Sequence, residues 1–212
     1  MEKYTTVLER NEAEFTEKRS RFIATLCHCE TEAEAMAFID EMRSKYWDAK
    51  HNVFAYSVEK GKMSRFSDDG EPHGTAGKPV FDVLMGSGAT DVAVVVTRYF
   101  GGILLGTGGL VRAYSKACKD AFETATFVLM VPCTQFETVC DYTDHRTLVS
   151  LIENKGGKIE NTDFTDKVKV EYSFKTEECE DFLLSLKENF SARLEAVECG
   201  NKTTAFEISK NV

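Results

Sequence analysis

The sequence contains no apolar run approaching the roughly 20 residues that a helix needs to cross a bilayer. Its first residues also lack the apolar core of a signal peptide. No C-x-x-C pair occurs among the seven scattered cysteines, which argues against a zinc cluster and against a disulfide framework. We therefore expect a cytoplasmic protein with no membrane partner, no metal and no obligatory cofactor.

Cys27 and Cys29 flank His28 and could be taken for part of a metal site. If this segment is a strand, however, the two cysteines lie on one face together with Ile23 and Thr25. That placement is typical of core thiols, which behave as small hydrophobic side chains. We therefore interpret both cysteines as structural.

Positive charge is in deficit. The chain carries 26 basic and 35 acidic side chains, a net charge of −9, which argues against nucleic-acid binding by bulk electrostatics. Residues 1–132 carry 16 basic and 19 acidic groups, whereas residues 133–212 carry 10 and 16. A polyanion would therefore need a local basic patch, which we place in the first part of the chain.

The most informative stretch runs from Asp91 to Phe122. The β-branched run 92–96 predicts a buried strand, a glycine-rich loop follows, and apolar residues from Leu110 onward recur at helical spacing. A strand and a loop that place arginines and backbone N–H groups at a helix N-terminus can form an anion-binding site. The candidate binding residues of this stretch are Arg98, Tyr99, Gly101, Gly102, Gly106, Gly108, Gly109 and Arg112.

Two nucleotide-binding fingerprints are absent from these glycines. The phosphate loop G-x-x-x-x-G-K-[ST] fails because Pro79 follows Lys78. The dinucleotide pattern G-x-G-x-x-G starts at Gly106, but its third glycine would fall on Val111. What remains is a generic anion-binding loop.

Residues 59–79 form a second polar, turn-rich segment. Loops dense in glycine and mixed charge often form sites, because their backbone can approach a ligand closely. The candidate binding residues here are Ser67, Asp68, Asp69, Glu71, Gly74, Thr75, Gly77 and Lys78. Lys18, Arg19 and Arg21 form a basic group at a predicted turn, which is either a solvated turn or an anion contact that extends the same surface.

The polar residues of segment 59–79 could form a catalytic or metal site, but each such interpretation has a purely structural alternative. Asp68, Asp69 and Glu71 could bind magnesium, or the adjacent aspartates and glycine could simply build a turn. Ser67 or Thr75 could in principle act as a nucleophile. However, no spacing in the sequence places either of them within hydrogen-bond reach of a base such as His51 or His73. We assign no catalytic residue.

The segments predict two α+β domains, residues 1–132 and 133–212. The first begins with three strands forming an antiparallel meander, at 4–9, 14–18 and 21–28. A helix with a capping box formed by Thr31 and Glu34 follows, and then a strand at 49–58 and a short helix from Pro79. The strand, glycine loop and long helix described above complete it.

Pro132 marks a predicted linker between the two domains. After it the order is strand, helix, strand, strand, helix, strand, with a further short strand at 203–208. The order β-α-β-β-α-β is that of a ferredoxin-like unit.

Four strings resemble the YigZ group of the IMPACT family: VTRYFGGILLGTGGLVRAYSKA, KRSRFIA, AKHNVFAY and FSDDGEPHGTAGKP. The resemblance covers almost all of the first domain, and His73 stands where a small residue is usual in the family. It implies a first domain with the fold of the second domain of small-subunit ribosomal protein five, with a mixed sheet plus helices. It also implies a ferredoxin-like second domain similar to domain five of elongation factor G.

The same resemblance implies a link to translation, since eukaryotic relatives bind the activator of a kinase that acts on an initiation factor. It provides no catalytic residues. We therefore expect a binding or regulatory protein that contacts RNA, the ribosome or a translation factor through the Gly/Arg-rich face. The alternatives are an enzyme acting on a small phosphorylated substrate, with a glycine-loop anion hole and a carboxylate-bound metal, and a pure protein–protein adaptor.

Overall fold

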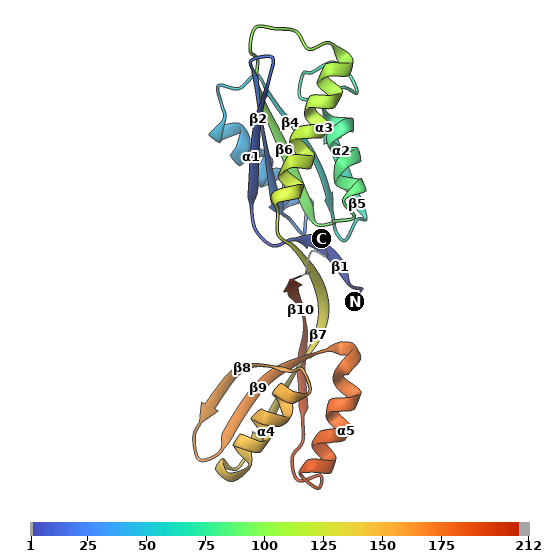
Figure 1. Ribbon diagram of the computed structural model, residues 1–212. Helices are drawn as coiled ribbons and strands as arrows, with labels where there is room; N and C mark the ends of the chain where they lie inside the picture. The colour runs from blue at the N-terminus through green and yellow to red at the C-terminus, as the bar shows by residue number, and fades with distance from the viewer. Residues whose placement is uncertain (1, 208–212) are drawn as a thin grey trace. The chain divides into compact units, whose positions relative to one another are not determined.

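The computed structural model describes residues 2–207, which form two compact units (Figure 1). The first unit contains residues 4–129 together with 206–207, and the second contains residues 2–3 and 130–205. The chain passes from one to the other within a single strand, β7 (Phe127–Cys140). The boundary proposed from the sequence, between residues 132 and 133, lies in this strand.

The first unit is an α+β domain built on a five-stranded sheet. Its elements are β1 (Tyr4–Val7), β2 (Asn11–Glu17), β3 (Ser20–His28), α1 (Glu32–Lys45), β4 (His51–Val58), β5 (Met63–Ser67), α2 (Gly77–Gly86), β6 (Val92–Tyr99) and α3 (Thr107–Thr124).

The strand order in this sheet is β2-β3-β6-β4-β5, and all four pairings are antiparallel. The mixed sheet implied by the resemblance is therefore wrong for this sheet. The physical reason lies in the connections. Strands β2 and β3, and β4 and β5, are joined directly as hairpins, and β6 enters between β3 and β4 running opposite to both.

Helices cover both faces of this sheet. Helices α2 and α3 pack on one face, over a core that includes Phe22, Val94 and Tyr114. Helix α1 packs on the other, over a core that includes Ile39 and Tyr56 (Figure 1). Because side chains alternate along a strand, neighbouring residues of β6 face different helices.

The N-terminal predictions are only partly correct. The β2–β3 hairpin is confirmed, but β1 pairs with β7 and not with β2, so there is no three-stranded meander. The capping of α1 is confirmed, because the Glu34 backbone N–H donates to the Thr31 hydroxyl at 3.2 Å. Strand β5 was missed because its burial is low and its sequence MSRFS shows little apolar alternation.

The second unit has the predicted order β-α-β-β-α-β. Its elements after β7 are α4 (Tyr142–Asn154), β8 (Lys158–Phe164), β9 (Val168–Lys175), a short 3₁₀ turn (Thr176–Glu178), α5 (Cys179–Asn189) and β10 (Val197–Glu207). Strand β7 lies between β9 and β10, and β8 pairs with the far side of β9, which gives the ferredoxin-like order. The two final strands predicted from the sequence are one strand, and Ile208 lies outside the described residues.

The predicted linker around Pro132 is extended strand. The pairing of β7 with β9 begins at Cys133. Pro132, which has no N–H to donate, therefore lies just outside this ladder, where a proline is tolerated. No helix within residues 2–207 has both the length and the apolarity needed to cross a membrane.

Candidate functional site

Asp68 folds the connection between β5 and α2 back on itself. Its carboxylate accepts hydrogen bonds from the backbone N–H groups of Gly74, Ala76 and Gly77 at 2.8, 3.0 and 2.8 Å. Burial raises the pKa of Asp68, but these three hydrogen bonds outweigh it and lower the pKa below its ordinary value. A Cβ on Gly77 would lie 2.6 Å from the carbonyl carbon of Ser67, so only glycine fits this turn. Asp68 is thus an anchor of the loop.

Asp69 points elsewhere, toward β4 and α1. Its Oδ2 accepts from the backbone N–H of Asn52 at 2.6 Å, and its Oδ1 lies 3.4 Å from a guanidinium nitrogen of Arg43. Its carbonyl oxygen lies 2.8 Å from Nδ1 of His51. All three contacts fix the path of the chain.

Glu71 is buried and is bound by residues from two other elements. Its Oε1 lies 2.5 Å from Nη1 of Arg98 at the end of β6, and it accepts from the Tyr114 hydroxyl of α3 at 2.9 Å. Nε2 of His51 lies 3.8 Å from the same oxygen. The side chains of Glu71 and Arg98 are 4% and 6% exposed. Glu71 therefore joins the 67–78 loop to β6 and α3.

This geometry changes the interpretation of Arg98, which was expected to offer its guanidinium to an anion. Nη1 of Arg98 faces Glu71, Nη2 lies 3.4 Å from the Ser20 hydroxyl, and the Phe22 and Phe100 rings lie on the guanidinium at 5.5 and 5.6 Å. The strand alternation of β6 turns this side chain inward, beside the core residues 94 and 96. Arg98 is a buried structural cation.

The three carboxylates of the 67–78 loop therefore do not converge. Asp68 faces backbone N–H groups, Asp69 faces β4 and α1, and Glu71 faces Arg98. Within residues 2–207, no group of three or more His, Cys, Asp or Glu side chains is arranged to hold a metal ion. These residues do not fit the magnesium alternative.

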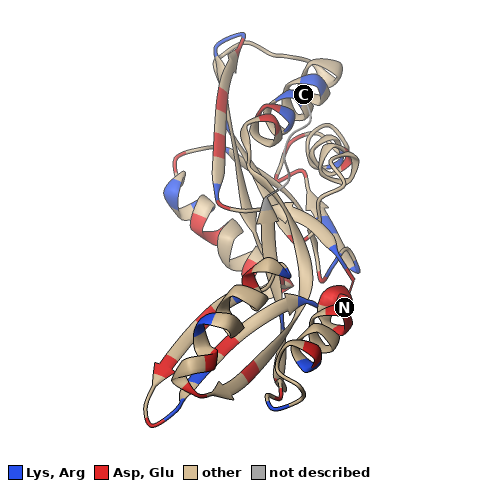
Figure 2. Cartoon of the chain, turned by 60° about the horizontal axis from the view of Figure 1, so that its bottom comes forward, with Lys and Arg blue, Asp and Glu red and all other residues tan. Residues whose placement is uncertain are grey.

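The glycine loop, residues 100–106 between β6 and α3, packs against the turn between β2 and β3. A Cβ on Gly101 would lie 2.0 Å from the carbonyl carbon of Arg19, so only glycine fits here. The backbone N–H of Gly101 donates to the Ser20 hydroxyl at 3.2 Å. Lys18 and Arg19 form the turn with positive φ angles of 46° and 67°. This tight turn directs its two basic residues outward beside the glycine loop, and Figure 2 shows its positive charge.

Arg112 lies in the second turn of α3, close to these residues. Lys18, Leu105, Gly109 and Arg112 line one cavity of about 300 Å³. Within the described part of the chain, no acidic group forms an ion pair with Lys18, Arg19 or Arg112, and all three are exposed. We call these three residues the basic tip. The adjacent helix, α3, begins at Thr107, and Gly106 before it offers no side-chain cap, which leaves N–H groups of the first turn available to an anion.

The glycine loop also exposes apolar side chains that were not among the predicted site residues. Phe100, Ile103 and Leu104 are 50%, 41% and 83% exposed. Large apolar residues placed between glycines in a loop, as in FGGILLG, are the signal that could have identified them.

Tyr99 and Arg21 are not part of this face. They are paired with each other in the β3–β6 ladder, one residue from the inward-facing pair Phe22 and Arg98. They therefore project from the opposite side of the sheet, where the Tyr99 hydroxyl donates to Asp48 at 2.7 Å.

The remaining predicted residues occupy the two loops and the start of each helix. Thr75 is buried and donates to the Pro72 carbonyl at 2.7 Å, and Lys78 forms an ion pair with Asp82. The side chain of His73 is fully exposed, so it adds no bulk to a pocket. Gly102, Gly106 and Gly108 lie on the outside of the glycine loop and the first turn of α3.

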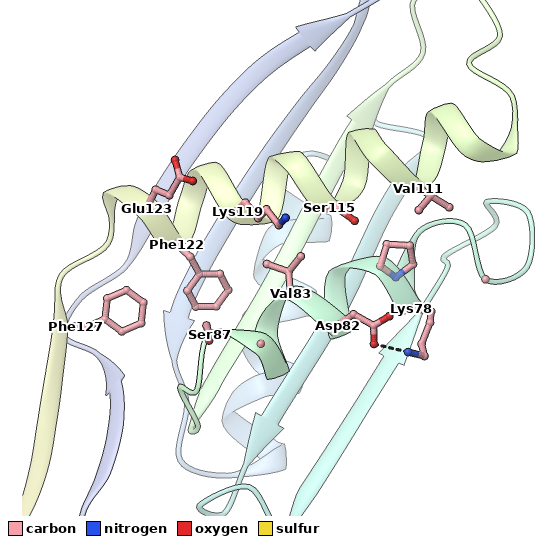
Figure 3. A pocket seen from close by; sticks show the side chains of 13 residues that line it. Lys78, Asp82, Val83, Ser87, Val111, Ser115, Lys119, Phe122, Glu123 and Phe127 are labelled. Atoms are coloured by element: carbon pink, nitrogen blue, oxygen red, sulfur yellow. Dashed lines mark hydrogen bonds and ion pairs between the residues drawn. The ribbon is translucent and has the colours of Figure 1, made fainter. Parts of the chain in front are cut away.

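A groove of about 890 Å³ lies between α2 and α3 and was not predicted (Figure 3). Val83, Phe122 and Phe127 line its apolar part, and Lys119 projects from α3 beside them. Gly74 and Lys78 are the predicted residues that reach it. Apolar residues on α2 and α3 outside the core-facing stripe are the signal that could have revealed it.

The comparisons with known proteins agree with this architecture. Two family models match the chain, the Impact N-terminal domain over residues 18–122 and a domain of unknown function, DUF1949, over residues 138–193. The IMPACT family member YigZ of Escherichia coli is 41% identical over 150 residues, which cover 69% of this chain and 74% of that protein. The chain belongs to the IMPACT family.

Other IMPACT relatives differ in how much of the chain they share. A family member from Haemophilus influenzae is 38% identical over 180 residues, covering 84% of this chain and 87% of that protein. A protein IMPACT homolog of Dictyostelium discoideum is 36% identical over 95 residues, covering 43% of this chain and 27% of that protein. A crystal structure of a hypothetical protein, 33% identical, superposes with a TM-score of 0.62 over 94% of this chain and 98% of that one.

Proposed function

We propose that this IMPACT family member is a cytoplasmic binding protein of the translation machinery, and that its basic tip binds phosphate groups of RNA, free or within the ribosome. The observation that supports this most strongly is the basic tip itself. Lys18, Arg19 and Arg112 are three exposed cations without an ion pair among residues 2–207, beside an uncapped helix N-terminus. Guanidinium, ammonium and backbone N–H groups are the donors that phosphate-binding proteins use.

The rest of the chain makes this cluster conspicuous. The net charge is −9, so acidic residues outnumber basic ones over the chain as a whole, and three neighbouring cations without ion pairs differ from the average surface. The exposed Phe100 ring, on the adjacent glycine loop, offers a face on which an unpaired base can stack. Charge and an aromatic side chain together favour single-stranded RNA over a small anion.

The link to translation rests on the family. The Impact N-terminal domain model covers residues 18–122 and so includes the whole tip. Proteins named IMPACT from Dictyostelium and Xenopus share about this much sequence with the chain, 95 residues in each case. A regulatory role for the shared domain would place its ligand on surfaces that it carries, and the tip is one of them.

The test is salt-dependent binding of a single-stranded RNA to wild type and to a triple variant, Lys18→Asn, Arg19→Asn and Arg112→Gln. Asparagine tolerates the positive φ angles of the turn. A matched control, Lys50→Gln, Lys62→Gln and Lys187→Gln, removes three exposed charges elsewhere. Losing three phosphate contacts should make the negative slope of log K against log[salt] shallower by about 2, at about 0.7 per contact on single strands.

If the tip variant, the control variant and the wild type all have the same slope, the basic tip does not bind RNA. A fall of the same size in the control would show that the attraction is a property of total charge and not of the tip.

The groove between α2 and α3 favours a second candidate function, the binding of a protein partner. Its apolar lining by Val83, Phe122 and Phe127 resembles surfaces that receive side chains of another chain. Affinity purification from the native host, with and without RNase, separates the two candidates. Partners lost on RNase treatment support RNA, and partners retained with RNase but lost in Val83→Glu support the groove.

The enzyme alternative has a direct test of its own. A thermal-shift screen with nucleotides and phosphorylated metabolites would detect a specific ligand, because a ligand at 100 times its Kd stabilises the protein by about 2.7 kcal/mol. We expect no such shift from a small phosphorylated compound. A shift that the tip variant abolishes would assign the tip to a small substrate instead of RNA.

A further inference from the structure

Two exposed aliphatic side chains lie in the middle of the glycine loop. Ile103 and Leu104 are 41% and 83% exposed, so they add little to the core of the first unit. The next residue, Leu105, is partly buried and packs against that core. The loop that carries them lies at the end of the unit, at the top of Figure 1. We call Ile103 and Leu104 the apolar pair.

The loop is anchored on both sides of the apolar pair. On one side, the backbone N–H of Gly101 donates to the Ser20 hydroxyl at 3.2 Å. On the other side, Leu105 packs against the core. Gly102 and Gly106 form the intervening bends, with positive φ angles of 80° and 72° that favour glycine. Because both ends are anchored, the pair is already ordered before a partner arrives, which lowers the entropic cost of binding.

The same anchors place the apolar pair beside the basic tip. Gly101 packs so closely on the backbone of Arg19 that an added Cβ would lie 2.0 Å from its carbonyl carbon. Leu105 lines one cavity together with Lys18 and Arg112. A partner that covers the pair therefore also meets the three unpaired cations. Its complementary surface combines negative charge with an apolar face.

An RNA stem from which a single strand departs has both properties. Its phosphates are anionic, and its last base pair exposes a flat face that no further pair covers. Leucine and isoleucine are among the side chains that nucleic-acid-binding proteins place against unstacked base pairs. The half-exposed ring of Phe100, which lies over the Arg98 guanidinium at 5.6 Å, offers a stacking surface for the first unpaired base.

A lipid bilayer also presents negative charge above apolar groups. Basic clusters that bind anionic membranes typically contain about four to eight Lys or Arg residues. The basic tip has three, on a chain with a net charge of −9, so its attraction to an anionic bilayer is weak. The small number of cations therefore favours a few closely spaced phosphates over a lipid surface.

We propose that the apolar pair packs on the end of an RNA stem, so that the RNA bound by the tip is a junction between a stem and a single strand. The inference rests on the proposed binding of RNA phosphates by the basic tip, and it names the RNA feature that the tip selects. The cations hold the phosphates at the junction, Phe100 stacks on the first unpaired base, and the apolar pair covers the last base pair.

The test compares two RNAs, a stem with a single-stranded tail and the tail alone, by fluorescence anisotropy with the full-length protein. We expect the tailed stem to bind about tenfold more tightly, which is the order of magnitude of one stacking contact. Ile103→Ser with Leu104→Ser should remove most of this preference and leave the affinity for the tail unchanged. Because these substitutions change no charge, a lost preference identifies an apolar contact and not the higher charge density of the stem.

The matched control is Leu184→Ser with Val197→Ser, which replaces two exposed apolar side chains of the second unit and should keep the preference. Melting temperatures close to that of wild type show that both variants are folded. A preference that the Ile103 and Leu104 variant retains, or that the control also loses, would overturn the inference.

The wild type separates this inference from the proposed function. Equal affinity for the two RNAs, with a salt dependence that the tip variant loses, would overturn the inference and leave RNA binding by the tip intact. Binding of neither RNA would overturn both. Sedimentation with vesicles of phosphatidylserine and phosphatidylcholine covers the lipid alternative. Vesicle binding that the Ile103 and Leu104 variant loses, without a preference for the tailed stem, would assign the apolar pair to a membrane surface instead.

Discussion

The two ends of the glycine loop differ in what their arginines do. Arg98, before the loop, has a buried side chain that faces Glu71 at 2.5 Å. Arg112, after the loop, is exposed and pairs with no acidic group in the described part of the chain. One arginine holds three elements together, and the other is available to a ligand.

The difference shows how a single loop can be both rigid and open. The buried pair ties the 67–78 loop, β6 and α3 into one scaffold, because removing either partner would leave an uncompensated charge in the core. The basic tip has no such internal partner and stands on the scaffold's edge. Substitutions in the buried Glu71–Arg98 pair should therefore reduce stability, whereas substitutions in the basic tip should reduce binding.

The largest effect is expected from Glu71→Ala. This change leaves Arg98 buried without its carboxylate and removes the acceptor of the Tyr114 hydroxyl, so we expect a loss of about 3–5 kcal/mol in the free energy of unfolding. Urea unfolding followed by circular dichroism measures it. Asp82→Ala, which breaks the exposed ion pair with Lys78, is the control and should change stability by less than about 1 kcal/mol. Equal effects of the two substitutions would contradict a structural role for Glu71.

Asp68→Asn should have an intermediate effect. Its amide group would face backbone donors that now point at a carboxylate, and we expect a loss of about 1.5–3 kcal/mol at neutral pH. Because folding lowers the pKa of Asp68, the stability that it contributes is present above the ordinary pKa of about 3.9 and is lost as the pH falls through the folded-state pKa. The difference between wild type and variant should therefore shrink below pH 4. A difference that stays constant down to pH 2 would show that the charge of Asp68 is not what matters.

The smallest effect on stability is expected from Arg112→Gln. The side chain is exposed and has no ion pair within residues 2–207, so the free energy of unfolding should change by less than about 0.5 kcal/mol. Its loss should nevertheless weaken RNA binding. A destabilisation comparable to that of Glu71→Ala would place Arg112 in the scaffold and remove the contrast between the two arginines.

Much of the fold follows from local patterns in the chain. The β-branched run that became β6, the Thr31 cap of α1 and the β-α-β-β-α-β order of the second unit all have short-range causes. Pairing partners do not, which is why β1 was wrongly joined to β2 and β5 was missed. Which strands pair depends on burial elsewhere in the sheet, a property that a single sequence does not display.

That the two predicted loops lie near each other could be inferred from the sequence, whereas the roles of their side chains could not. Glu71 of the 67–78 loop contacts Arg98 and Tyr114, which lie on the elements that precede and follow the glycine loop. Strand alternation alone could have separated Tyr99 from Arg98, since adjacent strand residues face opposite sides. Whether an arginine is buried against a carboxylate 27 residues away, however, depends on tertiary packing that no local motif encodes.

The most direct test of the contrast is the salt dependence of RNA binding by two arginine variants. Arg112→Gln should make the negative slope of log K against log[salt] shallower by about 0.7, because one phosphate contact with single-stranded RNA is lost. The double variant Glu71→Leu with Arg98→Met removes the buried pair together, so it should leave the slope unchanged even if its melting temperature shifts. An unchanged slope for Arg112→Gln together with a shallower slope for the double variant would contradict the proposal that the tip is the binding surface.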